Sequence, residues 1–197
     1  MAYTDFDPSS VEARLGVGLR PGQLFPDLAA VAVPGWLTDH LERIRGVALL
    51  TEKGRSEQLV APILVAVREL SGRTLALFSG LRMDVDPARG LAGECDFLLS
   101  RQEAVPVLRA PVVAVLEAKR GDIEAGLGQC IAQMVGARLF NERAGRTARI
   151  YGCVTTGEDW QFLRLEDDAA VYDSPRRYIS DLGDLLGVFA RIAADTV

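Results

Sequence analysis

The run from Pro111 to Lys119, PVVAVLEAK, constrains the fold of this chain more than any other segment. Its Val-Val-Ala-Val-Leu stretch is continuous, apolar and rich in β-branched residues, which is typical of a central strand covered on both faces. A strand of that kind needs helices on both sides of its sheet. We therefore expect an α/β fold with a mixed central sheet flanked by helices.

The other elements expected from the pattern fit one domain over residues 1–197. Residues 1–35 contain four prolines and are expected to form an irregular N-terminal segment. Apolar periodicity predicts helices over 36–45, 58–70, 123–144 and, at the C-terminal end, 178–193. Apolar runs predict strands over 74–81, 94–100, 111–119, 150–155 and 160–165, the last two as a hairpin.

Composition excludes several classes of function. The formal net charge of −5 argues against a protein that coats nucleic acid through bulk positive charge. The single histidine, His40, weakens zinc-protease and histidine-rich zinc sites. The three cysteines are widely spaced without a CxxC pair, so we expect Cys95, Cys130 and Cys153 to be buried thiols in a reducing compartment. No apolar run reaches the length of a membrane helix and no signal peptide is recognisable, so a cytoplasmic location without membrane contact is expected.

Charged side chains at the end of the buried strand mark the candidate site. Glu117 and Lys119 share one face of that strand, about 6–7 Å apart along it, because side chains alternate. Asp96 interrupts another apolar strand, and it converges with Glu117 if the two strands are neighbours. Two carboxylates that repel each other favour a cation between them, and oxygen ligands suit Mg²⁺ or Mn²⁺. With Lys119 to orient or help deprotonate a water, these groups suit phosphodiester hydrolysis.

Asp96 followed by Glu117-Ala118-Lys119 on consecutive strands, after an acid-bearing helix, resembles the PD-(D/E)xK nuclease superfamily. The resemblance implies a restriction-endonuclease-like core of order α-β-β-β-α-β over residues 56–165. It also implies that Glu57 of the first helix helps to place the metal and that Gln129 of the second helix faces the site, with Gln133 as the second match. Cys95 stands where the family has its motif proline, a position that is often replaced.

The chain is also similar to the nuclease domain at the start of type I restriction motor subunits. There, too, a helix with Glu and Pro, a Gly-x-x-Asp-Phe strand and a Glu-Ala-Lys strand follow one another. It looks like a member of a small stand-alone bacterial family of the same superfamily. That resemblance indicates the fold of the chain better than its biochemical function.

The leading hypothesis is a metal-dependent nuclease that cleaves DNA, with RNA as the less favoured substrate. Asp96, Glu117 and the carbonyl of Ala118 would hold Mg²⁺ or Mn²⁺, Lys119 would act on the attacking water, and Glu57 and Gln129 would support them. Two other classes stay open: a catalytically silent nucleic-acid-binding or assembly module, and a hydrolase of a small phosphorylated substrate. A homodimer is one candidate assembly, since C₂ dimers are the commonest.

Structural roles compete with these functional ones. Glu117 and Lys119 can form an ion pair at a strand end, although buried pairs usually cost stability. Asp96 can be a strand-end aspartate, and Glu57 can be an acid that complements a helix dipole.

Overall fold

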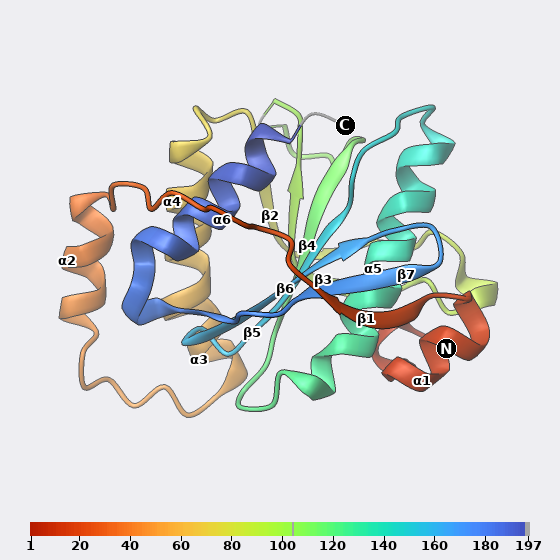
Figure 1. Ribbon diagram of the computed structural model, residues 1–197, viewed down its shortest axis with the longest axis horizontal. Coiled ribbons are helices and arrows are strands. Elements are labelled where there is room, and N and C mark those ends of the chain that lie inside the picture. The colour runs from red at the N-terminus through yellow and green to blue at the C-terminus, as the bar shows by residue number, and fades with distance from the viewer. Residues whose placement is uncertain (104, 196–197) are drawn as a thin grey trace.

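The computed structural model describes residues 1–103 and 105–195, in which the strands form one eight-stranded mixed sheet (Figure 1). The strands are β1 (Gly18–Gly22), β2 (Ala76–Arg82), β3 (Glu94–Ser100), β4 (Val112–Ala118), β5 (Tyr151–Thr155), β6 (Asp159–Leu165), β7 (Ala169–Asp173) and β8 (Arg177–Tyr178). They lie in the order β1-β7-β6-β5-β4-β3-β2, with β8 paired to β6 off this path.

Helices cover both faces of the sheet. They are α1 (Pro8–Leu15), α2 (Gly35–Arg43), α3 (Glu52–Arg55), α4 (Ala61–Leu70), α5 (Glu124–Arg143) and α6 (Leu182–Ala194). Figure 1 shows α1 and α5 on one side of the sheet and α2, α4 and α6 on the other, and each side has its own hydrophobic core. This confirms the prediction of a mixed sheet flanked by helices. Within the described residues, no helix has both the length and the apolar character to cross a membrane.

Strand β4 occupies the middle of the sheet, as its apolar run predicts. It pairs antiparallel with β3 and parallel with β5, and all seven of its residues are buried. Leu116 faces the core under α4 and α6, whereas Val115 faces the core under α5. The strand therefore receives apolar cover on both faces.

The first core helix is longer than its periodicity predicts. It begins at Glu52 with α3, continues through a π-helical turn, η2 (Ser56–Val60), and ends with α4. Thr51 caps it, because its hydroxyl accepts a hydrogen bond from the Gly54 amide. Pro62 is the second residue of α4 and follows directly on this π-helical turn, inside the continuous helix. The expected start near Gln58 is therefore wrong by about two helical turns.

The N-terminal segment is regular in places, which corrects the expectation of an irregular 1–35. Asp7 caps α1 by accepting a hydrogen bond from the Ser10 amide, and Gly16, with φ of 69°, ends the helix. Strand β1 then joins the sheet parallel to β7. A short 3₁₀ turn, η1 (Tyr3–Asp5), precedes α1, and both turn and helix pack on α5. Pro8 suits the first turn of a helix, so the prolines were misread as breakers.

The C-terminal third also departs from the expected order. The β5–β6 hairpin is confirmed by its antiparallel register. Strands β7 and β8 follow it and were not expected, and α6 begins at Leu182 after a 3₁₀ turn, η4 (Ile179–Asp181). The expected helix start at Tyr178 is therefore four residues early. A further 3₁₀ turn, η3 (Pro87–Arg89), separates β2 from β3.

Candidate functional site

Strands β3 and β4 bring Asp96 and Glu117 together, as the sequence predicts for neighbouring strands. Their antiparallel register pairs Phe97 with Leu116, which places Asp96 and Glu117 one step further along. The Ala118 amide donates a hydrogen bond to Asp96 Oδ2 over 2.7 Å. Asp96 is therefore held against the backbone of the strand that carries Glu117.

Lys119 reaches back along its own strand to Glu117. Its Nζ atom donates to Glu117 Oε1 over 2.8 Å and to Gln129 Oε1 over 3.2 Å. The Glu117 side chain is 3% exposed and that of Lys119 is 20% exposed. The ion pair that the sequence allows for this strand end is therefore present, and it is largely buried.

Helix α5 supplies two amides to this ion pair. Gln129 and Gln133 lie one turn apart, so they project from the same face of the helix. Gln133 donates from Nε2 to Glu117 Oε2 over 2.9 Å, whereas Gln129 accepts from Lys119. Gln133, ranked second from the sequence, is thus the residue that touches the carboxylate. Its own Oε1 atom is buried, with no hydrogen-bond partner among the described residues.

Burial and mutual repulsion make the two carboxyl groups hard to ionise. Burial, and then repulsion from Asp96, raise the pKa of Glu117 to about 7. Burial also raises the pKa of Asp96, although the hydrogen bond from Ala118 opposes that rise. Burial disfavours the charged form of Lys119, but the hydrogen bond and attraction from Glu117 outweigh it and raise its pKa. The site therefore holds one cationic lysine against two carboxyl groups.

A cleft with a volume of about 390 Å³ opens beside Asp96. Its wall includes Glu52, Glu57, Glu94 and Lys53. Asp96 and Ala118, which are joined by a hydrogen bond, also line it. Glu117 is not part of the wall, because it lies buried on the α5 side of the sheet. The surface that meets solvent at this site is therefore predominantly acidic.

Glu57 reaches the cleft but not the carboxylates. Its side chain is 58% exposed and pairs with Lys53 at 3.7 Å, one helical turn earlier. Glu52 is the closer acid in electrostatic terms, because its charge raises the pKa of both Asp96 and Lys119. Sequence reasoning missed Glu52 because it placed the helix start too late. The Thr51 cap was the signal that could have found it.

The donor set of this site suits a hard cation such as Mg²⁺ or Mn²⁺. Within residues 1–103 and 105–195, no three His, Cys, Asp or Glu side chains are gathered as a ready-made metal cage. The candidate oxygens are those of Asp96 at the cleft and those of Glu117, which already accept hydrogen bonds from Lys119 and Gln133. Mg²⁺ is usually bound by a few protein oxygens, and water molecules complete its coordination.

The cysteines take no part in hydrogen bonds to this site. Cys95, Cys130 and Cys153 are free thiols and all are buried, as expected. Burial raises the pKa of each thiol, so all three stay protonated and unreactive near neutral pH.

Comparison with family models, with curated proteins and with solved structures gave no match to this chain. The chemistry of the site is therefore deduced from its own side chains. Two carboxyl groups, one lysine and two amides converge at the end of a central strand, where Asp96 borders an open cleft.

Proposed function

We propose that this chain is a metal-dependent nuclease of the PD-(D/E)xK superfamily that hydrolyses phosphodiester bonds in nucleic acid, with DNA as the favoured substrate. The observation that carries the proposal is the convergence of Asp96, Glu117 and Lys119 at the end of β4. Each group comes from the position that the superfamily pattern requires. Perturbed titratable groups bordering a cleft are also typical of functional sites.

The order of elements supports the same proposal. From the first core helix onward it runs α4, β2, β3, β4, α5, β5. Strands β2, β3 and β4 are antiparallel neighbours, and α5 connects β4 to the parallel strand β5. This sequence of elements agrees with a restriction-endonuclease-like α-β-β-β-α-β core over residues 56–165.

Asp96, Glu117 and the carbonyl of Ala118 would hold the Mg²⁺ or Mn²⁺ ion. The bound ion supplies positive charge at the scissile phosphate and makes water a better nucleophile. The site has a surplus of negative charge for this purpose, because Lys119 is the one cation that touches either carboxylate among the described residues. A cation displaces the proton that Glu117 otherwise takes up near pH 7.

Lys119 would orient the attacking water and stabilise negative charge as it develops on the phosphate. Its side chain is 20% exposed, so it is held by the protein and only partly open to solvent. Gln129 accepts one of its hydrogen bonds and fixes its direction, while Gln133 fixes Glu117. Positioning of this kind is a main source of rate enhancement in phosphoryl transfer.

One observation favours a second candidate, a catalytically silent nucleic-acid-binding or assembly module. Both oxygens of Glu117 already accept hydrogen bonds, from Lys119 and Gln133. A closed ion pair of this kind is also what a purely structural strand end would show. This module predicts salt-dependent binding of nucleic acid without cleavage.

A cleavage assay with matched variants tests the proposal. Wild type, Lys119→Gln, Glu117→Gln and Arg43→Gln are incubated with plasmid, linear duplex, single-stranded DNA and RNA, in Mg²⁺, Mn²⁺ or EDTA. Arg43 is an exposed residue of α2 that forms no salt bridge with the described residues, so it controls for loss of one positive charge. Metal-dependent cutting should persist in the control and fall roughly 10²–10⁴-fold in Lys119→Gln.

The same assay separates the alternatives. Cutting that survives both Lys119→Gln and Glu117→Gln overturns the proposal, because it comes from another site or another protein. Salt-dependent binding without cutting in any metal supports the silent module. Hydrolysis of small phosphate esters without attack on polymers supports a phosphatase-like hydrolase.

A further inference from the structure

A second pocket, with a volume of about 320 Å³, lies where α6 ends beside the start of β5. Three arginines line it: Arg149, Arg164 and Arg191. Asp195 is the acidic residue of its wall, and Tyr151 contributes a hydroxyl. Leu24, Phe25 and Ala194 supply the apolar part of the lining. We call this the arginine pocket.

The arginine pocket is separate from the acidic site. Strands β4 and β5 run parallel, with Ala118 opposite Thr155 and Ala114 opposite Tyr151. Tyr151 therefore lies four residues before Thr155, the β5 residue opposite the acidic site, which is a distance of about 13 Å along the strand. The two sites lie toward opposite ends of β5.

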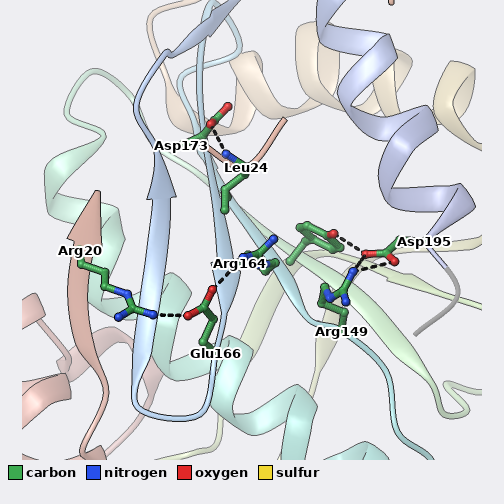
Figure 2. Close-up of polar contacts among 8 residues, drawn as sticks. Arg20, Leu24, Arg149, Arg164, Glu166, Asp173 and Asp195 are labelled. Atoms are coloured by element: carbon green, nitrogen blue, oxygen red, sulfur yellow. Dashed lines mark hydrogen bonds and ion pairs between the residues drawn. The ribbon is translucent and has the colours of Figure 1, made fainter. Parts of the chain in front are cut away.

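Positive charge exceeds negative charge around the arginine pocket. Arg149 Nη1 donates to both carboxylate oxygens of Asp195, over 2.8 and 2.6 Å, and the Tyr151 hydroxyl donates to the same carboxylate. Glu166 is shared between Arg164 and Arg20 (Figure 2). Counting Arg20 and Glu166, four guanidinium groups therefore stand against two carboxylates around the pocket, in a chain whose net charge is −5.

Two arginines lie at the end of α6, where the partial negative charge of a helix C-terminus offsets part of the arginine charge. Arg101 donates to the backbone carbonyls of Ala193 and Asp195, over 3.2 and 2.9 Å. These contacts hold the last turn of the helix in place without fully neutralising the guanidinium charge. Arg191 projects from the same helix into the pocket wall, and it forms no salt bridge with the described residues. The charge of the pocket therefore favours an anionic ligand.

The lining suits a phosphate group. Guanidinium groups bind phosphate through paired N–H donors, and they do so better than other side chains. The rings of Phe25 and Tyr151 stack on each other at 5.9 Å with an interplanar angle of 29°, and both residues are almost fully buried, so they form the packed apolar side of the pocket. The pocket volume lies at the lower end of the range for small-molecule sites.

We propose that the arginine pocket binds a small phosphorylated molecule through its phosphate group, with the phosphate on Arg191 and on the neighbouring Arg149 and Arg164. Asp195 is the internal counter-ion that holds Arg149 in place when the ligand is absent. This binding is independent of the acidic site and of its proposed nuclease activity.

Isothermal titration at low salt in EDTA tests the proposal with AMP, ADP, pyrophosphate and inorganic phosphate as probes. Arg191→Gln should weaken ADP binding about fivefold or more, which corresponds to one unit charge pair at about 4 Å near water. Arg43→Gln removes the same charge elsewhere and should leave binding unchanged. Asp195→Asn should tighten binding about fivefold, because it removes a repulsive charge and keeps an oxygen that accepts from Arg149.

Three results would overturn this assignment. The first is no saturable binding of any probe. The second is an equal loss of binding in Arg191→Gln and Arg43→Gln, which indicates only bulk charge. The third is binding of a short single-stranded oligonucleotide, but not of ADP, through Arg191, which makes the pocket part of a nucleic-acid surface. ADP binding by Glu117→Gln with wild-type affinity would show that the two sites are independent.

Discussion

Gln133 donates a hydrogen bond from Nε2 to Glu117 Oε2 over 2.9 Å, and its other polar atom is buried without a partner among the described residues. A buried amide oxygen without a donor costs about 1–3 kcal/mol, so this oxygen lowers the free energy of unfolding. Its hydrogen bond fixes the position of the Glu117 carboxylate. The relationship also ties α5 to β4 at the acidic site.

Replacing Gln133 by leucine should make Glu117 harder to ionise. The hydrogen bond from Gln133 lowers the pKa of Glu117, so its loss raises that pKa further above about 7. The pH at which Mn²⁺ binding is half-maximal should therefore rise by roughly one unit. Gln129→Leu is the matched control, since Gln129 contacts Lys119 and not Glu117. A midpoint that moves equally in both variants would contradict this assignment of roles.

Stability should fall as pH rises through the range in which Glu117 ionises. Its pKa is raised from 4.5 to about 7 by burial and by Asp96, so the folded state binds the proton more tightly than the unfolded state. The resulting stabilisation is complete below the unfolded pKa and is lost as pH rises through about 7, by at most about 1.4 kcal/mol per pH unit.

Urea unfolding between about pH 5 and pH 8 measures this slope. The raised pKa of Asp96 acts in the same direction. Glu117→Gln should flatten the dependence, and Mn²⁺ should stabilise wild type most at the alkaline end, where the carboxylates are ionised. An unchanged slope in Glu117→Gln would show that other groups control it.

The two cleft acids should differ in importance. Glu52 acts electrostatically on Asp96 and Lys119, whereas Glu57 is 58% exposed and pairs with Lys53. Glu52→Gln should therefore lower Mn²⁺ affinity severalfold, while Glu57→Gln changes it less than twofold. Titration calorimetry with the two variants in parallel checks this order. The reverse order would restore the role that the superfamily pattern implies for Glu57.

A single methyl group on α5 should detach the N-terminal segment. A Cβ atom at Gly128 would lie 2.4 Å from the backbone of Asp7, which cannot move without displacing the start of α1. Gly128→Ala should cost about 1–3 kcal/mol of unfolding free energy. Gly121→Ala is the control, since a Cβ there meets nothing within 4 Å. Equal stability of the two variants, measured by urea unfolding, would contradict the packing of η1 and α1 on α5.

Much of the central sheet follows from local pattern. The bounds expected for β3 agree with the structure, and those of β4 differ by one residue at each end. Side-chain alternation placed Glu117 and Lys119 on one face, and the structure joins them at 2.8 Å. These features depend on a few adjacent residues, so they can be read directly from the sequence.

Other features could not be predicted from the sequence, because they depend on contacts between distant segments. Strand β1 belongs to the sheet only because β7, about 150 residues later, offers it a partner edge. The preference for Gln133 over Gln129 at Glu117 depends on the rotation of α5 against β4. The arginine pocket draws on residues near 24, 149, 164 and 191, which no sequence pattern connects.

The sequence by itself determined the central buried strand, the charged residues at its end and the helices on either side. The tertiary structure alone decided that Asp96 meets the backbone of Ala118, that Glu52 rather than Glu57 acts electrostatically on Asp96, and that Gln133 holds Glu117. The physical reason is that strand and helix periodicity are local properties of the chain. Strand register and helix docking are set by packing across the whole core, which a local pattern does not contain.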